Sequence, residues 1–186
     1  MSSFVFDPGK YGPVFSGLID PEKLNDLGAG TGTQKIPEIV RSVNPEDFFG
    51  NTRIVDSQAA RACLAGLALH YDLLKESHGI SQSVATASGS FWHGIMHRRE
   101  GDYGNSKYWF RRVGEHPVFN LLQTETERID KQNLLNHTAW DPFKFIDLCE
   151  STIGSGQGME IFCKKVQRIE WLLLFDFCYD LATNTE

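Results

Sequence analysis

The sequence lacks the features that mark several large classes of protein. Its longest apolar run, WLLLFDFCYDL at residues 171–181, is about half a membrane span and contains Asp176 and Asp180, so it predicts a buried helix. The first residues, MSSFVFDPGKYGP, have no basic stretch followed by an apolar run, which argues against a secretory signal. The net charge of −6 offers no general attraction to nucleic acid or to anionic lipid. We therefore expect neither nucleic acid nor a membrane as a partner.

Cysteine is scarce, and no two cysteines are close enough to form a CxxC unit. The four are Cys63, Cys149, Cys163 and Cys178, in mostly apolar surroundings. This usage favours reduced thiols, so we expect a cytoplasmic protein.

Internal repeats are absent, and no segment alternates between apolar and polar residues over a convincing length. A chain of 186 residues with 41% hydrophobic residues is long enough to bury one ordinary core. Helical periodicity without alternation predicts an all-α fold, a single-domain irregular helical bundle over residues 1–186 with an extended N-terminal segment.

Residues 1–56 are expected to wrap irregularly around a helical core at 57–186. This first part is interrupted by DPGKYGP, LGAGTGT and NPEDFFG, with room only for short helices such as PEKLNDL and IPEIVRSV. GAGTGT is similar to a phosphate-binding loop, but it lacks the GK[ST] ending and follows no predicted strand. We interpret it as a simple loop.

The core begins with a long apolar stripe at helical spacing. Its members, each three or four residues apart, are Ala60, Leu64, Leu67, Tyr71, Leu74 and His78. They predict one helix from about Ser57 that Gly79 ends. After a loop containing Ser81, Ser83, Thr86 and Ser88, a second helix is expected over 90–100, with Gly101 at its end.

Four more helices are predicted after a turn at GDYGN. SKYWFRRV forms a short one that ends at Gly114, and Pro117 suits the first position of the next, HPVFNLLQTETERI. The last two are WDPFKFIDLCE and MEIFCKKVQRIEWLLLFDFCYDLA.

The stretch HGIMHRREGD at residues 93–102 carries the main candidate site. His93 and His97 are four apart, so on a helix they project side by side and can share one metal at roughly 2.0 to 2.1 Å. Glu100 lies on the same stripe, but seven residues from His93 is about 10.5 Å of rise, too far for both to bind one ion. We predict that Glu100 orients a ligand or acts as a general base; the alternative is an ion pair with Arg98 or Arg99.

Two further histidines are candidate ligands. His78 continues the apolar stripe, so its ring should be buried and face the helix that carries His93. His116 stands just before a helix start, where the dipole keeps the ring neutral, as a ligand must be. The competing interpretation is that these histidines are core groups or exposed helix residues. His70 and His137 are expected to be structural or solvated.

Three segments together resemble a known family. They are ESHGISQ, SFWHGIMHRREGDYGNSKYWFRRVGEHPVF and WDPFKFIDLCE, and the likeness to the small hemocyanin-like proteins of fungi and bacteria, the cyclopenase or viridicatin synthase family, covers about residues 60–180. The resemblance implies a zinc-dependent helical enzyme. Its reaction contracts the ring of an epoxidised benzodiazepinedione (cyclopenin-type) to a 4-aryl-3-hydroxyquinolin-2-one (viridicatin-type) with loss of methyl isocyanate.

The histidines of this chain limit what can be carried over from that family. A binuclear copper centre of the hemocyanin kind needs six histidines from paired helices, whereas this chain has six in total and one HxxxH. We therefore expect a single zinc ion, with His78, His93, His97 and His116 as candidate ligands. Trp92, Tyr108 and Trp109 are candidates to line a pocket for an aromatic substrate, and core packing is the alternative for them.

Two other functions remain open at this point. Lys107, Arg111 and Arg112, interleaved with aromatic residues, are compatible with a helical binding module without catalysis, although a solvated basic face is the commoner meaning of such a run. The second function is that of a metal enzyme of the same family that acts on an unrelated small molecule, because function lies in the site and not in the fold.

Overall fold

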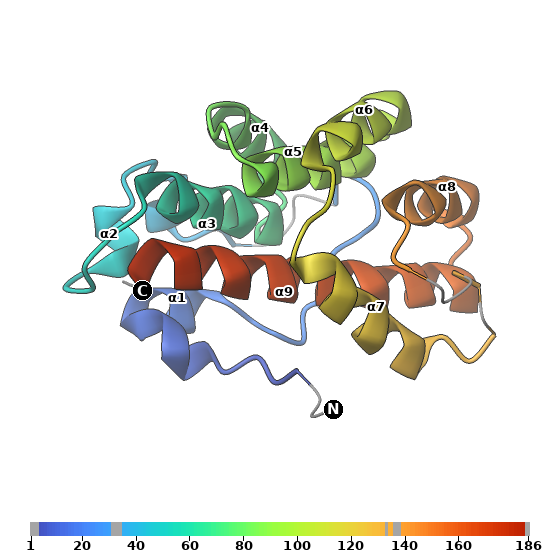
Figure 1. The fold of residues 1–186 in the computed structure, drawn as a ribbon, viewed down its shortest axis with the longest axis horizontal. Helices are drawn as coiled ribbons and strands as arrows, with labels where there is room; N and C mark the ends of the chain where they lie inside the picture. Colours follow the sequence, from blue (N-terminus) through green and yellow to red (C-terminus); the bar gives the residue numbers. More distant parts are fainter. Residues whose placement is uncertain (1–3, 31–34, 133, 136–138, 185–186) are drawn as a thin grey trace.

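The chain folds as helices joined by loops, the longest of which connects α1 to α2. The computed structural model describes residues 4–30, 35–132, 134–135 and 139–184, and none of these residues is in a strand (Figure 1). The α-helices are Gly12–Leu18 (α1), Glu46–Phe49 (α2), Ser57–His70 (α3), Leu74–Gln82 (α4), Ala87–Glu100 (α5), Tyr103–Val113 (α6), Val118–Ile129 (α7), Pro142–Thr152 (α8) and Gly158–Thr183 (α9). Two 3-10 turns, η1 (Pro8–Tyr11) and η2 (Glu38–Arg41), lie in the N-terminal part. The predicted all-α fold is confirmed.

Helix α9 forms the axis of the molecule. Figure 1 shows it running the length of the fold, with α3 beside it, α7 and α8 toward its N-terminal end and α1 near its C-terminal end. Its centre is fully buried at Leu174, Phe175 and Cys178, as the apolar run at 171–181 predicts. In the described part of the chain, no helix is both long and apolar enough to cross a membrane.

A close contact sets the approach of α9 to α3. The indole N–H of Trp171 donates to the carbonyl of Gly66 at 2.8 Å. A Cβ at Gly66 would lie 2.7 Å from the Trp92 ring, so only glycine lets α3 approach both indoles this closely.

The prediction of one helix from Ser57 to Gly79 is wrong. The helix ends at His70, Asp72 takes a left-handed conformation with φ of 60°, and α4 begins at Leu74 with Gly79 inside it. The apolar spacing continues across the break, which is why the sequence pattern did not reveal it.

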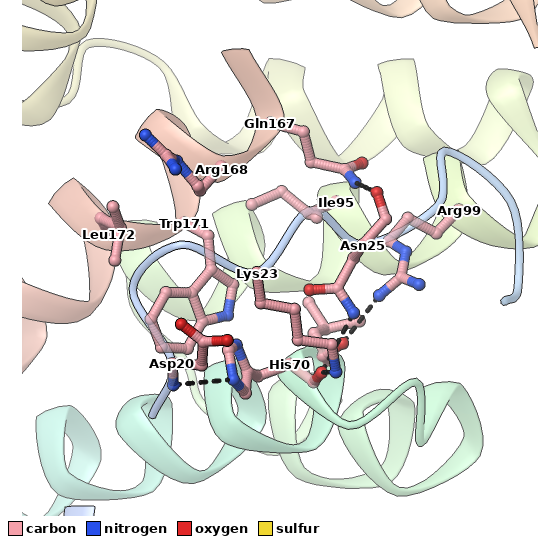
Figure 2. Close-up of a pocket in the computed structure, with 11 residues that line it drawn as sticks. Asp20, Lys23, Asn25, His70, Ile95, Arg99, Gln167, Arg168, Trp171 and Leu172 are labelled. Carbon is pink, nitrogen blue, oxygen red and sulfur yellow. Dashed lines mark hydrogen bonds between the residues drawn. The ribbon is translucent and has the colours of Figure 1, made fainter. Parts of the chain in front are cut away.

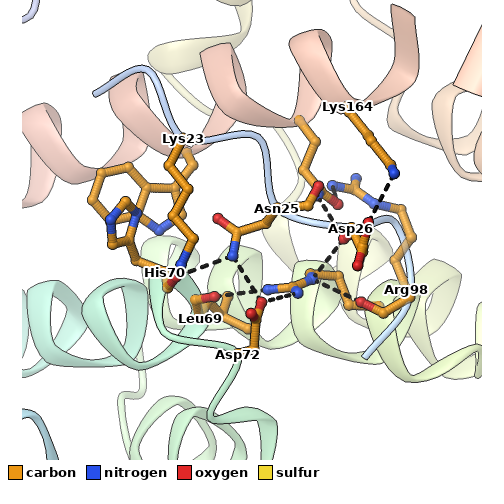
Figure 3. Close-up of polar contacts among 12 residues, drawn as sticks. Lys23, Asn25, Asp26, Leu69, His70, Asp72, Arg98 and Lys164 are labelled. Carbon is orange, nitrogen blue, oxygen red and sulfur yellow. Dashed lines mark hydrogen bonds and ion pairs between the residues drawn. The ribbon is translucent and has the colours of Figure 1, made fainter. Parts of the chain in front are cut away.

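Side chains from elsewhere in the chain end α3 at that point (Figure 3). Arg99 of α5 donates to the Leu69 carbonyl at 2.7 Å, and Lys23 and Asn25 donate to the His70 carbonyl. The Asp72 carboxylate accepts from Arg99 and from Asn25. These long-range hydrogen bonds satisfy the last carbonyl groups of α3 and replace another helical turn.

The N-terminal part wraps around the core, but its α-helices, α1 and α2, lie at other positions than the two short helices predicted. Residues 21–27 form no helix, because the chain there lies over α3 and α5, where the carbonyls of Asp26 and Gly28 accept from Arg99 Nε at 3.2 Å each. Residues 36–43 form only the turn η2. Of the GAGTGT stretch, residues 28–30 are loop, as predicted, and residues 31–33 lie outside the described part.

The other helices lie where they were predicted, with starts shifted by up to three residues; α6 begins at Tyr103, inside the predicted turn GDYGN. Gly101 at φ of 84° ends α5, and Gly114 at φ of 61° ends α6. Helix α5 starts three residues earlier than expected, because the Thr86 hydroxyl accepts from Gly89 N and caps it. Pro117 is the residue before α7 and not its first residue.

A fully buried ion pair links α5 to α9. The guanidinium of Arg98 donates to both carboxylate oxygens of Glu170, the two side chains have no exposure, and Gln167 and the Phe145 ring complete the surroundings of Arg98. Each charge here is out of water, so each depends on the other.

We predict that Glu170→Gln lowers the free energy of unfolding by about 3 to 5 kcal/mol, because it leaves the Arg98 charge buried without its counter-ion. Urea unfolding followed by circular dichroism measures this. The exposed pair Arg168–Glu22 provides the control, since Glu22→Gln should change stability by at most about 1 kcal/mol. Equal losses in the two variants would contradict the assignment.

Two buried histidines should make stability depend on pH. Burial lowers the pKa of His70 to about 3 and that of His116 to about 4, and His70 Nε2 accepts from the Asp20 N–H at 3.3 Å. The stability that each neutral, buried ring contributes to the native state is complete above the unfolded-state pKa of about 6.5. Below that pH the unfolded state binds protons that the native state does not bind, so the stability falls.

We therefore expect each of these two histidines to cost about 1.4 kcal/mol of stability per pH unit as the pH falls below about 6. Unfolding free energies measured from pH 7 to 4.5 in the wild type and in His70→Gln isolate the His70 contribution. The variant should show the shallower profile, and parallel profiles would exclude this role for His70.

Candidate metal centre

Three histidines from two helices converge on one point. His78 of α4 and His93 and His97 of α5 each offer one ring nitrogen, and these three nitrogens lie within 4.8 Å of one another. The ring centroid of His78 lies 4.6 Å from that of His93 and 5.6 Å from that of His97, and the His93 and His97 centroids are 4.7 Å apart. Three imidazoles at this separation can bind one ion.

The three rings differ in burial. His93 and His97 are 1% and 7% exposed, as a helix face turned inward requires. His78 faces them, as predicted, but it is only half-buried. The reason is that it lies on the short, separate helix α4 and not at the end of the long helix that was expected.

Hydrogen bonds fix the protonation of His93. Its Nδ1 lies 2.8 Å from the Ser81 hydroxyl, which itself donates to the Ser77 carbonyl at 2.6 Å. Since a hydroxyl has a single proton, it must accept from His93, so Nδ1 carries the hydrogen and the Nε2 lone pair is free. Burial first, and then the proximity of His97 and His78, lower the pKa of His93 to about 3, which keeps the ring neutral.

Glu100 determines which nitrogen of His97 carries a hydrogen. Its Oε1 lies 2.6 Å from His97 Nδ1, and an ionised carboxylate only accepts, so Nδ1–H donates and Nε2 is free. A carboxylate or hydroxyl on the far nitrogen of a histidine is the usual support of a metal ligand.

The alternative role of Glu100 as a partner of a neighbouring arginine is wrong. Arg98 pairs with Glu170, and Arg99 pairs with Asp72. Glu100 is a partly exposed group that orients His97, and its role as a general base stays a prediction.

His116 does not join the other three histidines. Its Nε2 lies 3.1 Å from the Ser88 hydroxyl, and its Nδ1 accepts from the Val118 N–H at 3.3 Å. The ring packs against Phe91 and Phe177, with centroids 5.3 and 5.0 Å away. Burial, and not the helix start, lowers the pKa of this ring and keeps it neutral. Both of its nitrogens have partners, so the expected group of four histidines is a group of three.

The three aromatic candidates lie in three different environments. Trp92 is fully buried and packs against Trp171, so it is a core residue. Trp109 packs on His93, with ring centroids 4.1 Å apart. Tyr108 is 47% exposed beside Trp109. Only Trp109 therefore touches the histidine group.

Sequence reasoning missed Ser81. It lay in a predicted loop, although it follows His78 by three residues and so shares its helix face. The spacing HxxS on a helix opposite HxxxH was the available signal.

Acidic residues near His97 offer a poorer alternative site. Glu100 and Asp102 also come within 4.8 Å of it, but both are exposed. The Asp102 oxygens accept from the backbone and side-chain nitrogens of Asn105 and so cap α6.

A separate cavity lies under the N-terminal segment, between α3 and α9. Figure 2 shows Asp20, Lys23 and Asn25 of that segment lying against His70 and Trp171. The space amounts to about 20 Å³, enough for about one water molecule. It is too small for a substrate.

Comparison with protein-family models, with curated proteins and with solved structures finds no match to this chain. The candidate centre is therefore defined by its own geometry: a buried group of three histidines that can bind a metal ion.

Proposed function

We propose that His78, His93 and His97 bind one zinc ion and that the protein is a zinc-dependent enzyme acting on a small aromatic molecule. The observation that carries this proposal is the convergence of the three rings, with the Nδ1 atoms of His93 and His97 already engaged by Ser81 and Glu100. Zinc held by three neutral histidines keeps an open position, where it polarises a carbonyl or lowers the pKa of bound water or a substrate N–H.

Glu100 is the proposed general base. Its Oε1 orients His97, while Oε2 has no hydrogen-bond partner among the described residues, and the side chain is 40% exposed. A carboxylate in this position can take a proton from a group bound beside His97 and pass it to solvent.

For the reaction we propose the ring contraction of a cyclopenin-type benzodiazepinedione, with loss of methyl isocyanate. Its support is the resemblance of SFWHGIMHRREGDYGNSKYWFRRVGEHPVF to the cyclopenase family, and this stretch contains His93, His97 and Glu100. A different small-molecule substrate at the same metal is the second candidate, because related sites serve different substrates. A binding module without catalysis would need no metal.

We predict about one zinc per chain in protein purified without metal-chelating resin, measured by elemental analysis. His93→Ala and His97→Ala should each lose most of it, because each removes a ligand. His116→Gln is the matched control and should keep its zinc, since His116 lies outside the group. Full zinc content in either alanine variant would reject the site.

Glu100→Gln separates orientation from proton transfer. It should retain zinc with about 10- to 100-fold lower affinity, measured by chelator competition, and turn over the cyclopenin-type substrate about 10²- to 10⁴-fold more slowly. The exposed Glu115 provides a control, and Glu115→Gln should behave as the wild type. Unchanged zinc affinity and turnover in Glu100→Gln would leave Glu100 without a role at the site.

A further inference from the structure

A surface hollow adjoins the histidine group. It has a volume of about 420 Å³ and lies where the end of α4, the start of α5 and the side of α6 meet. Its walls come from the loop between α4 and α5, from Ser90, and from Trp109 and Arg112. This volume falls in the range of small-molecule sites.

The start of α5 gives the hollow a positive end. Thr86 and Ala87 line it, and α5 is a helix of 14 residues. The Thr86 hydroxyl satisfies the N–H of Gly89, whereas the N–H groups of Ala87 and Ser88 have no acceptor within the helix. Such a helix start favours a negatively charged or strongly accepting group.

Ser90 presents a polar atom to the same space. It is 8% exposed and lines the hollow. Its hydroxyl has no hydrogen-bond partner in the part of the chain that the structure describes. Solvent reaches the hydroxyl oxygen itself, so this side chain is open to the hollow and can donate to or accept from a group bound there.

Arg112 adds a positive charge. Its guanidinium lies 5.1 Å from the centre of the Trp109 ring and 3.4 Å from the Tyr108 hydroxyl, and among the described residues no acidic side chain pairs with it. Lys107 on the same helix differs, since it pairs with Asp147. An arginine held by an aromatic ring and without a counter-ion suits a carboxylate.

Trp109 connects the hollow to the histidines. It lines the hollow, and its ring also packs on His93 at 4.1 Å. A flat ring in contact with the part of Trp109 that lines the hollow would therefore lie near the group of His78, His93 and His97.

From these features we infer that the hollow binds a planar aromatic carboxylate, with its ring against Trp109 and its carboxylate at Arg112, Ser90 and the start of α5. That such a ligand is the substrate rests on the proposed zinc enzyme in its second form, with a small-molecule substrate other than the cyclopenin type, which has no carboxylate. Binding itself does not depend on zinc.

The test measures binding of naphthoate by calorimetry to the full chain, as purified and after chelator treatment. We expect binding in both states, weakened about 10-fold or more by Arg112→Met, which removes a charge-assisted hydrogen bond, and about 2- to 10-fold by Trp109→Leu. Arg111→Met is the matched control, because Arg111 lies over Phe143 of α8 and outside the hollow. It should bind within about 2-fold of the wild type, a change smaller than one charge-assisted hydrogen bond gives.

Two further ligands distinguish the alternatives. Naphthamide has the same ring without the charge, and phosphate has the charge without the ring; both should bind at least about 10-fold more weakly than naphthoate. Equal binding of either ligand, equal binding by Arg112→Met, or no binding of naphthoate to the chelator-treated chain would overturn the inference. A chain that binds naphthoate but holds no zinc would refute the proposed enzyme and leave this site intact.

Discussion

The candidate site depends on the hydrogen bonds that end α3. Arg99, Lys23 and Asn25 take the last carbonyl groups of that helix, and the chain turns at Asp72. If α3 ran on, His78 would lie about 12 Å farther along the same axis than His70. The turn instead folds α4 back onto α5, and His78 comes to face His93 and His97.

Helix α5 connects the candidate site to the rest of the fold. His93 and His97 face α4, Arg98 reaches α9, and Arg99 reaches the end of α3 and the N-terminal segment. Almost every side is buried, so polar side chains occur all around the helix and each has its own partner. The position of the site therefore depends on the contacts of α5 with four parts of the chain: α4, α9, the end of α3 and the N-terminal segment.

Local patterns predicted much of the fold and a part of the site. Gly101 and Gly114 end helices where expected, and the pair His93 and His97 lies on one helix face. These features depend on residues within one helical turn, which a sequence pattern records. The break at residues 71–73 depends on side chains about 30 to 50 positions away, and apolar spacing holds no information about them.

The same distinction explains the errors about individual side chains. His116 met the criterion of a neutral ring at a helix start, but its partners Ser88 and Phe177 come from other helices. Trp92 was indistinguishable in sequence from Trp109, although one fills the core and the other touches His93. The contact between the Ser81 hydroxyl and His93 depends on the packing of α4 against α5, which the sequence pattern does not record.

The contact between Trp109 and His93 has an optical consequence. An indole in contact with an imidazole responds to the charge on that ring, so its emission differs when the ring is neutral, protonated or bound to a cation. The other three tryptophans, Trp92, Trp140 and Trp171, are buried, and Trp171 lies beside the ring of His70, with centroids 5.1 Å apart, and not beside His93. The protein thus carries a built-in fluorescent reporter at the edge of its histidine group, and events there can be followed without an added label.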